Sequence, residues 1–325
     1  MNLEGSRILV TGGCGLIGST TIDQILLDRK PEKIVIFDNL VRGSMRNVQD
    51  ILKDERVELV KGDIRDRDAV MKVTDGMDAV IHMAAIRITA CAAEPREAME
   101  VMCDGTYNVV EAAQKCGVKR VLAASSASVL GMADTFPTKE DHHPYNNRTW
   151  YGASKVMLEG LLRSFNDMHG LDYAAMRYFN VYGPRMDIHG KYTEVLVRWM
   201  QRIENGESPL ILGDGTTSMD FIYIEDLARA NVLALEADCP DEVFNVASGV
   251  ETSLSELEDF DTLIVCSSFR HKDYVNASTA SLLRRFARFG KTLDDRHDAV
   301  RPRPVVSILA NLLLPRAFCD DGFSV

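Results

Sequence analysis

Short apolar runs alternate with amphipathic segments through the first 180 residues, and this alternation limits the possible folds more than any other feature of the sequence. The apolar runs are short and continuous, which is typical of strands buried on both faces. They predict a parallel sheet covered by helices, that is, a doubly wound α/β fold. The runs are RILVTG (7–12), KIVIFD (33–38), VELVKGD (57–63), DAVIHMA (78–84), KRVLAAS (119–125) and DYAAMRYF (172–179), with helical patterns at 16–29, 66–73, 95–117 and from 149 onwards.

The alternation breaks after residue 180, where a loop rich in glycine, proline and charge follows. Residues 1–182 are therefore expected to form the sheet domain, with 220–247 returning to it. A smaller C-terminal lobe is expected from 183–219 and 248–325. The elements predicted in this part are helices at 193–206 and 225–237 and strands at 209–215 and 243–248.

Charge and cysteine content exclude several classes of protein. The formal net charge is −11, whereas nucleic-acid and anionic-membrane partners require a basic surface. The seven cysteines are scattered and form no C-x-x-C pair, so the sequence predicts neither a disulfide framework nor a metal site. There is no basic-then-apolar leader and no apolar run near the roughly 20 residues of a membrane span, so a cytoplasmic protein is expected.

The stretch TGGCGLIG (11–18) joins the first strand to the first helix and places glycines at positions 12, 15 and 18. Glycines with this spacing let backbone N–H groups at a helix start approach a pyrophosphate, which side chains would block. Asp38 ends the second strand, where a carboxylate can accept hydrogen bonds from an adenosine ribose. The sequence thus predicts a Rossmann-type dinucleotide site that favours NAD, although Arg42 nearby keeps NADP open.

Two further strand ends carry candidate cofactor contacts. In GDIRD (62–66), Asp63 and Ile64 are placed to hold an adenine, although a simple turn with a helix cap at Asp66 explains the motif about as well. In HMAA (82–85), the small Ala84 and Ala85 would let a cofactor pass over the strand end. His82 itself is expected to be a packed strand histidine rather than a base.

The stretch YGASK (151–155) places Tyr151 and Lys155 one helical turn apart with only small residues between them. A phenol titrates near pH 10, and both a neighbouring ammonium and an oxidised nicotinamide would favour its anion. Tyr151 could then remove a proton from a substrate hydroxyl while hydride leaves the same carbon. The spacing alone is common on helix surfaces.

The fifth strand ends in SSASVLG (125–131), at the edge of the sheet where sites form in such folds. A serine hydroxyl there could hold a substrate oxygen beside Tyr151. Ser126 is the preferred candidate, with Ser125 and Ser128 as alternatives.

These motifs, followed by RYFNVYGPR (177–185), occur in an order typical of one family. The chain resembles an extended short-chain dehydrogenase/reductase of the NAD-dependent epimerase/dehydratase family, and is most similar there to UDP-glucose 4-epimerase-like proteins. The resemblance covers residues 1 to about 257. It implies a tightly held NAD, a nucleotide-sugar substrate, catalysis by Ser126, Tyr151 and Lys155, and a homodimer built from helices at about 95–116 and 149–169.

The resemblance also implies a set of binding residues. Asn180 matches a substrate-diphosphate contact, although a turn-forming asparagine explains it comparably well, and the loop with Arg87 is one residue shorter than usual. The expected cofactor contacts are Gly12, Gly15, Leu16, Ile17, Gly18, Asp38, Asn39, Asp63, Ile64, Ala84, Ala85, Arg87, Tyr151, Lys155 and Tyr178. The expected substrate contacts are Ser126, Asn180, Arg185, Lys191 and Tyr192.

Ala127 and Ser128 narrow the implied reaction. Relatives that eliminate water have an acid pair at these positions, and sugar-acid decarboxylases have a glutamate nearby. Neither residue here is a general acid or base. What remains is epimerisation at C4 of a UDP-hexose through a 4-keto intermediate, with Tyr151 as base. The alternatives are an NAD-binding sensor with an impaired substrate lobe, or another nucleotide-sugar epimerase or dehydrogenase.

Four features depart from the family pattern, of which Met219 and the segment after about residue 258 leave room for the sensor alternative. Met102 replaces a common asparagine, and Leu130 replaces the tyrosine of a VYG ending. Met219 replaces an arginine that commonly grips the nucleotide diphosphate, so one charge-assisted contact is missing. The segment after about residue 258 does not resemble the usual C-terminal part.

Overall fold

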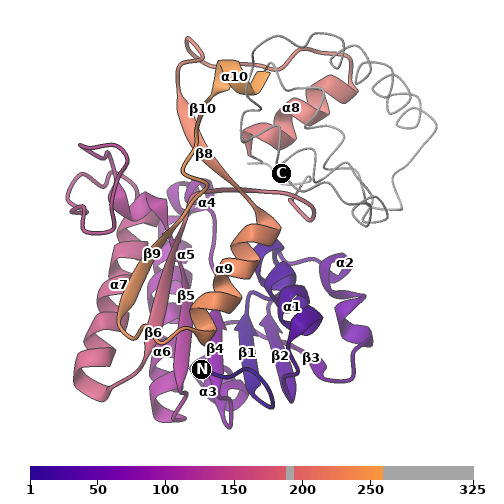
Figure 1. Cartoon of the computed structure of the whole chain (residues 1–325), viewed down its shortest axis with the longest axis vertical. Coiled ribbons are helices and arrows are strands. Elements are labelled where there is room, and N and C mark those ends of the chain that lie inside the picture. Colours follow the sequence, from indigo (N-terminus) through magenta and orange to yellow (C-terminus); the bar gives the residue numbers. More distant parts are fainter. Residues whose placement is uncertain (188–193, 259–325) are drawn as a thin grey trace, which may run out of the picture. The chain divides into compact units, whose positions relative to one another are not determined.

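The computed structural model describes residues 1–187 and 194–258 of the chain (Figure 1). The chain divides into two compact units. The first comprises Met1–Val181 and Phe221–Gly249, and the second comprises Tyr182–Asp220 and Val250–Val325. The first unit holds the glycine-rich turn, Ser126, Tyr151 and Lys155.

A seven-stranded parallel sheet forms the centre of the first unit, in the order β3-β2-β1-β4-β5-β6-β9. The order reverses between β1 and β4, and in such sheets ligands bind beyond the carboxyl ends of the strands at this point. The predicted doubly wound fold is confirmed. The strands are β1 (Arg7–Thr11), β2 (Lys33–Asp38), β3 (Val57–Lys61), β4 (Ala79–His82), β5 (Arg120–Ser126), β6 (Tyr173–Tyr178) and β9 (Glu242–Val246).

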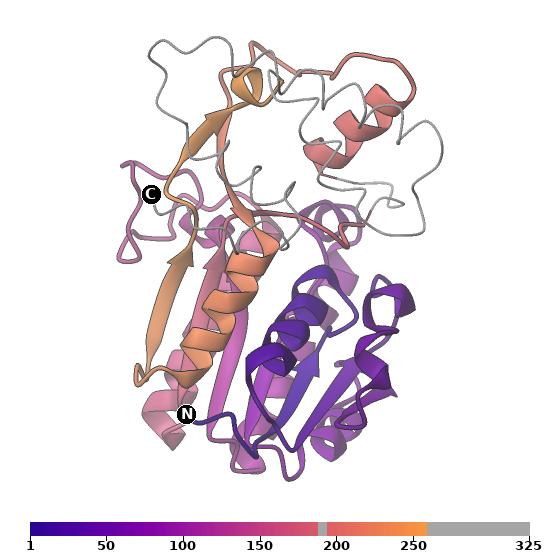
Figure 2. The same ribbon diagram turned by 45° about the vertical axis from the view of Figure 1, so that its right-hand side comes forward.

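Helices cover both faces of this sheet (Figures 1 and 2). Successive strand side chains point to opposite faces, so Ile8 and Val10 enter one core cluster and Leu9 enters the other. The first cluster includes Ile22 of α1 and Leu227 of α9. These two helices lie side by side on one face of the sheet (Figure 2). The second includes side chains from α3, α6 and α7. The unbroken apolar character of the strands follows from this two-sided burial.

The longer helices follow the predicted pattern, whereas the short helices α2, α4 and α10 were not predicted, and a π-helical turn lies between α5 and α6. None of the described helices combines the length and apolar character needed to cross a membrane. In the first unit they are α1 (Leu16–Asp28), α2 (Met45–Val48), α3 (Arg67–Thr74), α4 (Ile88–Ala93), α5 (Pro95–Met99), the π-helical η2 (Glu100–Gly105), α6 (Thr106–Lys115), α7 (Trp150–His169) and α9 (Ile224–Glu236), with the 3-10 turns η1 (Ile51–Lys53) and η3 (Ala127–Leu130).

The second unit corrects one prediction. Residues 209–215 form no strand, and the strand lies later, in β8 (Ser218–Tyr223). Pro209 lacks a backbone donor, and Leu210 and Leu212 are exposed, so within the described residues this run has neither a ladder nor a buried face. β8 belongs to a three-stranded sheet of order β10-β8-β7, with β7 (Asn180–Tyr182) and β10 (Glu251–Ser253). Helices α8 (Val195–Glu204) and α10 (Leu254–Glu258) complete the described elements.

Candidate active site

The turn between β1 and α1 is closed by glycines that no other residue could replace without movement. Gly12 has φ +69°, and a Cβ added there would lie 2.7 Å from the backbone nitrogen of Ala84. A Cβ on Gly18 would lie 2.7 Å from the carbonyl oxygen of Gly12. Gly15, the N-cap of α1, provides no side chain to cap the first N–H groups, and the first turn carries no acid. Leu16 and Ile17 pack against the core beneath. The turn therefore fits a pyrophosphate.

Asp38 lies beside this turn at the end of β2 and is 7% exposed. Its Oδ2 accepts a hydrogen bond from the Cys14 N–H at 3.0 Å, and its Oδ1 accepts one from the Leu40 N–H at 2.8 Å. The backbone thus orients the carboxylate against the glycine turn. A glycine turn followed by an oriented carboxylate on the neighbouring strand fits the pyrophosphate and ribose of NAD.

The structure brings Asn39 and Asp63 together beyond the ends of β2 and β3. The Asn39 amide donates to Asp63 Oδ2 at 3.0 Å, and Arg65 Nη2 lies 2.8 Å from the same oxygen. The hydrogen bond from Arg65 is the main reason that the pKa of Asp63 falls to about 2. Ile64 is buried, and Asp66 caps α3 by accepting from the Ala69 N–H. The helix-cap alternative for this motif therefore holds for Asp66.

His82 is packed at the end of β4, as predicted, and Ala84 and Ala85 follow it. Its two ring nitrogens lie 2.8 Å from the Thr11 hydroxyl and 3.1 Å from the Thr106 hydroxyl. Burial, assisted by the charge of Lys155, lowers the pKa of His82 to about 3. His82 is therefore a neutral structural group at neutral pH.

Tyr151 and Ser126 meet where α7 begins and β5 ends. Thr149 caps α7 by accepting from the Gly152 N–H, which fixes the first turn that carries Tyr151. The Tyr151 hydroxyl is hydrogen-bonded to Ser126, whose Oγ also accepts from the Ser128 N–H at 3.1 Å. Ser125, the adjacent alternative, instead donates to Glu159 Oε1 at 2.5 Å. Of the two neighbouring serines, Ser126 is the one paired with the phenol.

Lys155 lies beneath the Tyr151 ring. Its Nζ is 5.7 Å from the ring centroid and donates to the carbonyl oxygen of Ala124 at 2.6 Å. The side chain is 5% exposed, and this burial lowers the pKa of Lys155 to about 8. The lysine is therefore held in place and still mostly protonated at neutral pH.

Burial is the dominant influence on Tyr151. Burial raises the pKa of Tyr151, whereas the hydrogen bond with Ser126 and the charge of Arg42 lower it by less. The prediction combined the Lys155 ammonium with an oxidised nicotinamide, and in the chain by itself burial outweighs the favourable charges. Ionisation of this phenol requires further positive charge beside it.

An apolar wall behind Tyr151 was not predicted. Cys91 of α4, Ala98 of α5 and Met102 of η2 form a buried cluster against which Ala85 and Tyr151 pack. The short sequence ITACAA (88–93) is not among the helical patterns, so the position of Cys91 was missed. Met102 stands where the family pattern has asparagine, and at this position it packs in an apolar cluster.

A buried ion pair one helical turn beyond Lys155 was also missed. Glu159 accepts from Arg177 Nε at 2.8 Å and from Arg177 Nη2 at 2.7 Å. Together with the hydrogen bond from Ser125, this pair ties α7 to β5 and β6. The only sequence signal for it is a carboxylate four residues after Lys155.

The remaining predicted residues belong to several different elements. The Tyr178 hydroxyl donates to Asn231 Oδ1 at 2.8 Å within the core of the first unit. Arg87 is the N-cap residue of α4, and Asn180 begins β7. Arg185 lies in the second unit with φ +72°. Lys191 and Tyr192, like the segment after about residue 258, lie outside the described residues.

The other departures from the family pattern are ordinary parts of the fold. Leu130 is 4% exposed in η3. Met219 lies in β8, opposite Thr252 of β10.

The chain belongs to the NAD dependent epimerase/dehydratase family, whose model matches residues 8–247. The family and its cofactor, NAD, are thereby confirmed as predicted. The chain is accordingly an enzyme of the nucleotide-sugar epimerase/dehydratase family.

Similar proteins place it close to sugar-nucleotide epimerases. It is 34% identical over 254 residues to a putative UDP-glucose 4-epimerase of Methanocaldococcus jannaschii, covering 78% of this chain and 80% of that protein. It is 36% identical to the solved UDP-N-acetylglucosamine 4-epimerase of Methanobrevibacter ruminantium M1, with TM-score 0.75, covering 80% and 83% of the two chains. A UDP-N-acetyl-alpha-D-glucosaminuronate decarboxylase of Bacillus cytotoxicus is also similar, at 30% identity, covering 77% and 78%. The family therefore leaves the reaction to be decided by the site.

Proposed function

We propose that the chain is an NAD-dependent UDP-hexose 4-epimerase of the UDP-glucose/UDP-galactose type, with Tyr151 as base. The observation that carries the proposal is the hydroxyl pair of Ser126 and Tyr151, positioned above the buried ammonium of Lys155. Two hydroxyls and a nearby cation at the carboxyl edge of a parallel sheet suit the oxidation of a secondary alcohol.

The glycine turn and Asp38 would hold the cofactor, with its pyrophosphate on the start of α1 and its ribose on the carboxylate. Asn39, Asp63, Ile64, Ala84, Ala85 and Arg87 are proposed to line the rest of its path, and Tyr178 supports that path from the core. When bound, NAD supplies a hydride acceptor that can return the hydride in the same cycle.

Ser126 is proposed to hold the substrate O4 beside Tyr151. The Tyr151 phenolate removes the O4 proton as the C4 carbon is oxidised, and the phenol returns that proton after the 4-keto sugar has presented its other face. Burial raises the pKa of Tyr151, so the phenolate forms only when added positive charge lies near it. Lys155 keeps one cation in place beneath the ring throughout.

Ala127 and Ser128 favour epimerisation over dehydration or decarboxylation. Both residues follow Ser126 in η3, and neither supplies a carboxyl group to act at C5 or C6 of a sugar. In this proposal the ketone is only an intermediate, so the chain needs no second acid or base.

The substrate is proposed to be bound by Asn180, Arg185, Lys191 and Tyr192. Met219 cannot provide a charge-assisted bond to a diphosphate, so Arg185 and Lys191 would carry that contact. A homodimer through α5, η2, α6 and α7 stays a prediction, which the exposed Met99 and Tyr107 favour.

The test is an assay of purified protein with UDP-galactose and UDP-glucose, and in parallel with their N-acetyl counterparts. We expect interconversion of at least one pair. Tyr151→Phe should reduce kcat by about 10²–10⁴-fold, the usual contribution of a general base. Tyr145→Phe, which removes only the hydroxyl of an exposed tyrosine outside the helices of the predicted dimer, serves as the matched control and should retain activity.

Two results would contradict the proposal. Turnover that survives Tyr151→Phe would refute the assigned base. NAD that co-purifies with a protein inactive on every sugar pair would favour the sensor alternative, to which Met219 and the atypical C-terminal segment point. Mass spectrometry of ligands retained through native purification separates these outcomes.

A further inference from the structure

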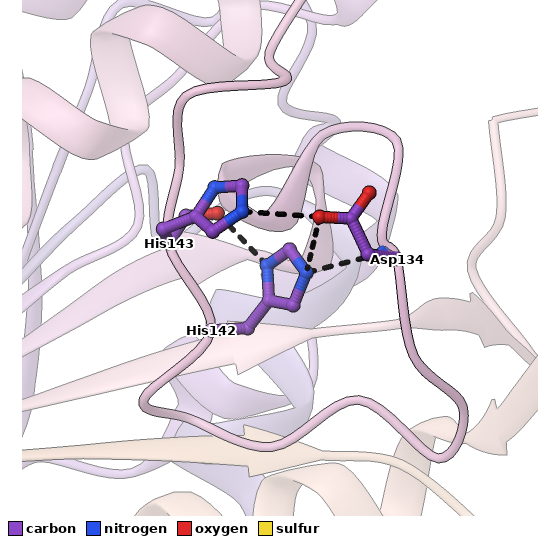
Figure 3. Close-up of side chains that lie close together, drawn as sticks. All are labelled: Asp134, His142 and His143. Carbon is purple, nitrogen blue, oxygen red and sulfur yellow. Dashed lines mark hydrogen bonds and ion pairs between the residues drawn. The ribbon is translucent and has the colours of Figure 1, made fainter.

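Three potential metal ligands converge in the loop that joins η3 to α7. Asp134 Oδ2 lies 3.1 Å from His143 Nε2 and 4.0 Å from His142 Nε2, and the three ligand atoms lie within 4.8 Å of one another. Figure 3 shows both imidazoles directing a nitrogen toward the same carboxylate. Two imidazoles and one carboxylate form a common ligand set for zinc.

Both the His142 ring and the Asp134 carboxylate are oriented by groups behind them. His142 Nε2 accepts from the Asp134 N–H at 3.1 Å, so the ring proton lies on Nδ1 and is donated to the His143 carbonyl at 2.8 Å. Asp134 Oδ1 accepts from the Asn146 amide at 3.0 Å. A donated ring N–H and a hydrogen-bonded carboxylate are the outer contacts that metal-binding side chains usually have.

The two histidines are also held against each other. Their rings stack with centroids 4.6 Å apart, and the His143 ring stacks in turn on Tyr145. The His142 side chain is only 8% exposed. Adjacent histidines on a loop would ordinarily point apart into solvent, so this arrangement supplies two ordered nitrogens at one place.

We propose that Asp134, His142 and His143 form a binding site for a divalent cation of the zinc class. Imidazole nitrogens select zinc, nickel or copper over magnesium and calcium, which require oxygen ligands. Asp134 and His143 are 58% and 43% exposed on their side chains, so water can complete a fourth position.

The ion requires a small contraction of the cluster. In a tetrahedral site, ligand atoms about 2.0–2.1 Å from one ion lie roughly 3.4 Å apart. The 3.1 Å separation is close to this distance, and the 4.0 Å separation approaches it if the His142 nitrogen rotates inward.

The binding step balances without an added reactant. The Tyr145 N–H faces His143 Nδ1 at 3.4 Å, so the His143 proton lies on Nε2, toward Asp134. On binding, this proton moves to Nδ1 and the Nε2 lone pair goes to the ion. Binding of the ion therefore breaks the long contact between the Tyr145 N–H and His143 Nδ1, and the bond from the Asp134 N–H to His142 Nε2. Both are weak compared with a metal–nitrogen bond.

The loop connects the two ends of the proposed active site. It follows η3, which begins directly after Ser126, and it enters α7 just before Tyr151. Asn147 closes the loop by donating to the Ser128 carbonyl at 2.6 Å. An ion bound at the cluster would restrict the motion of this loop. It would also stabilise the folded chain, because it binds the folded state and not the unfolded state.

The test uses chelator-treated full-length protein titrated with ZnCl₂ against a zinc-binding dye, and with CoCl₂ followed by visible absorption. We expect one cation per chain bound at the cluster, Co²⁺ bands without thiolate charge transfer, and a raised Tm with Zn²⁺. The triple variant Asp134→Asn, His142→Gln, His143→Gln should lose that equivalent and the Tm shift. His169→Gln, an exposed histidine on α7, is the matched control and should keep both.

A single variant outside the ligand set adds an independent check. Asn146→Ala removes the bond behind Asp134 Oδ1 and should weaken zinc binding by about 10–100-fold, with circular dichroism unchanged. Zinc binding that persists in the triple variant, or a Co²⁺ spectrum with thiolate bands, would place the cation elsewhere and overturn the proposal. Absence of any stoichiometric binding to the wild-type chain would also overturn it.

Discussion

Glu159 and Arg177 form a two-point ion pair in which each side chain is only 9% exposed. Glu159 lies one helical turn from Lys155, and its charge raises the lysine pKa against the larger effect of burial. Ser125 donates to the same carboxylate. The helix carrying Tyr151 and Lys155 is thus fastened to the two strands that end beside them.

Replacing Glu159 by glutamine should leave the Arg177 charge buried without its counter-charge. The expected cost is about 3–5 kcal/mol in the free energy of unfolding, measured with urea. Lys53→Met, which breaks the exposed pair with Asp50, should change it by less than about 1 kcal/mol. Equal costs for the two variants would show that burial of the pair is unimportant. In the active enzyme, Glu159→Gln should also shift the pH profile, because Lys155 loses a charge that supports its proton.

Lys155 should make stability depend on pH in the alkaline range. Its pKa falls from the ordinary lysine value of 10.5 to about 8 in the folded chain, so the unfolded chain binds more protons between these values. The cost of burying the ammonium is fully present below pH 8 and disappears as pH rises to 10.5. Relative to Lys155→Met, the wild type should therefore gain up to about 3 kcal/mol between pH 7 and 10.5. A difference that does not vary with pH would contradict the lowered pKa.

His82 should have the corresponding effect in acid. Its pKa falls from 6.5 to about 3, so the unfolded chain binds the extra proton below pH 6.5 and stability is lost as pH falls toward 3. Between pH 6.5 and 5 the wild type should lose about 2 kcal/mol more than His82→Gln, measured by urea unfolding at each pH. Parallel curves for the two proteins would indicate that the buried imidazole accepts a proton readily.

Gly12→Ala should prevent NAD binding. Both Gly12 and Gly5 have left-handed backbones, with φ +69° and +71°, so alanine costs each about 1 kcal/mol. Only at Gly12 does the new Cβ meet backbone atoms, whereas at Gly5 nothing lies within 4 Å. Gly5→Ala should therefore lose only the stability due to backbone strain and keep its NAD, measured by nucleotide content and by titration. Equal NAD content in the two variants would exclude the glycine turn as the cofactor site.

Local pattern predicted most of the first unit. The apolar runs predicted the strands of the large sheet, because a strand buried on both faces is apolar along its whole length. The glycine turn and Asp38 were predicted from their positions at the ends of the first two strands. Residues 209–215 were misassigned because a short apolar run does not reveal whether a partner strand lies beside it. The strand instead is β8, which carries polar residues and is recognisable only from its pairing with β7 and β10.

Contacts between distant residues were beyond the reach of pattern. Cys91 approaches Tyr151, and Arg177 approaches Glu159, only after the sheet has formed. The outcome at Tyr151 depends on the same folding, because burial there outweighs charge. Sequence spacing placed Tyr151 and Lys155 one helical turn apart, but their pKa values depend on the residues that enclose them.

The pairing of β5 with β6 places Ser125 opposite Arg177 and Ser126 opposite Tyr178. Neighbouring residues on a strand point to opposite faces of the sheet. A shift of one residue in this pairing would therefore place Ser126 beside the Glu159 carboxylate and Ser125 beside the Tyr151 phenol. The two serine hydroxyls would then exchange partners, although the amino-acid sequence had not changed. The accuracy with which these two strands align is thus itself a requirement for any chemistry performed at their ends.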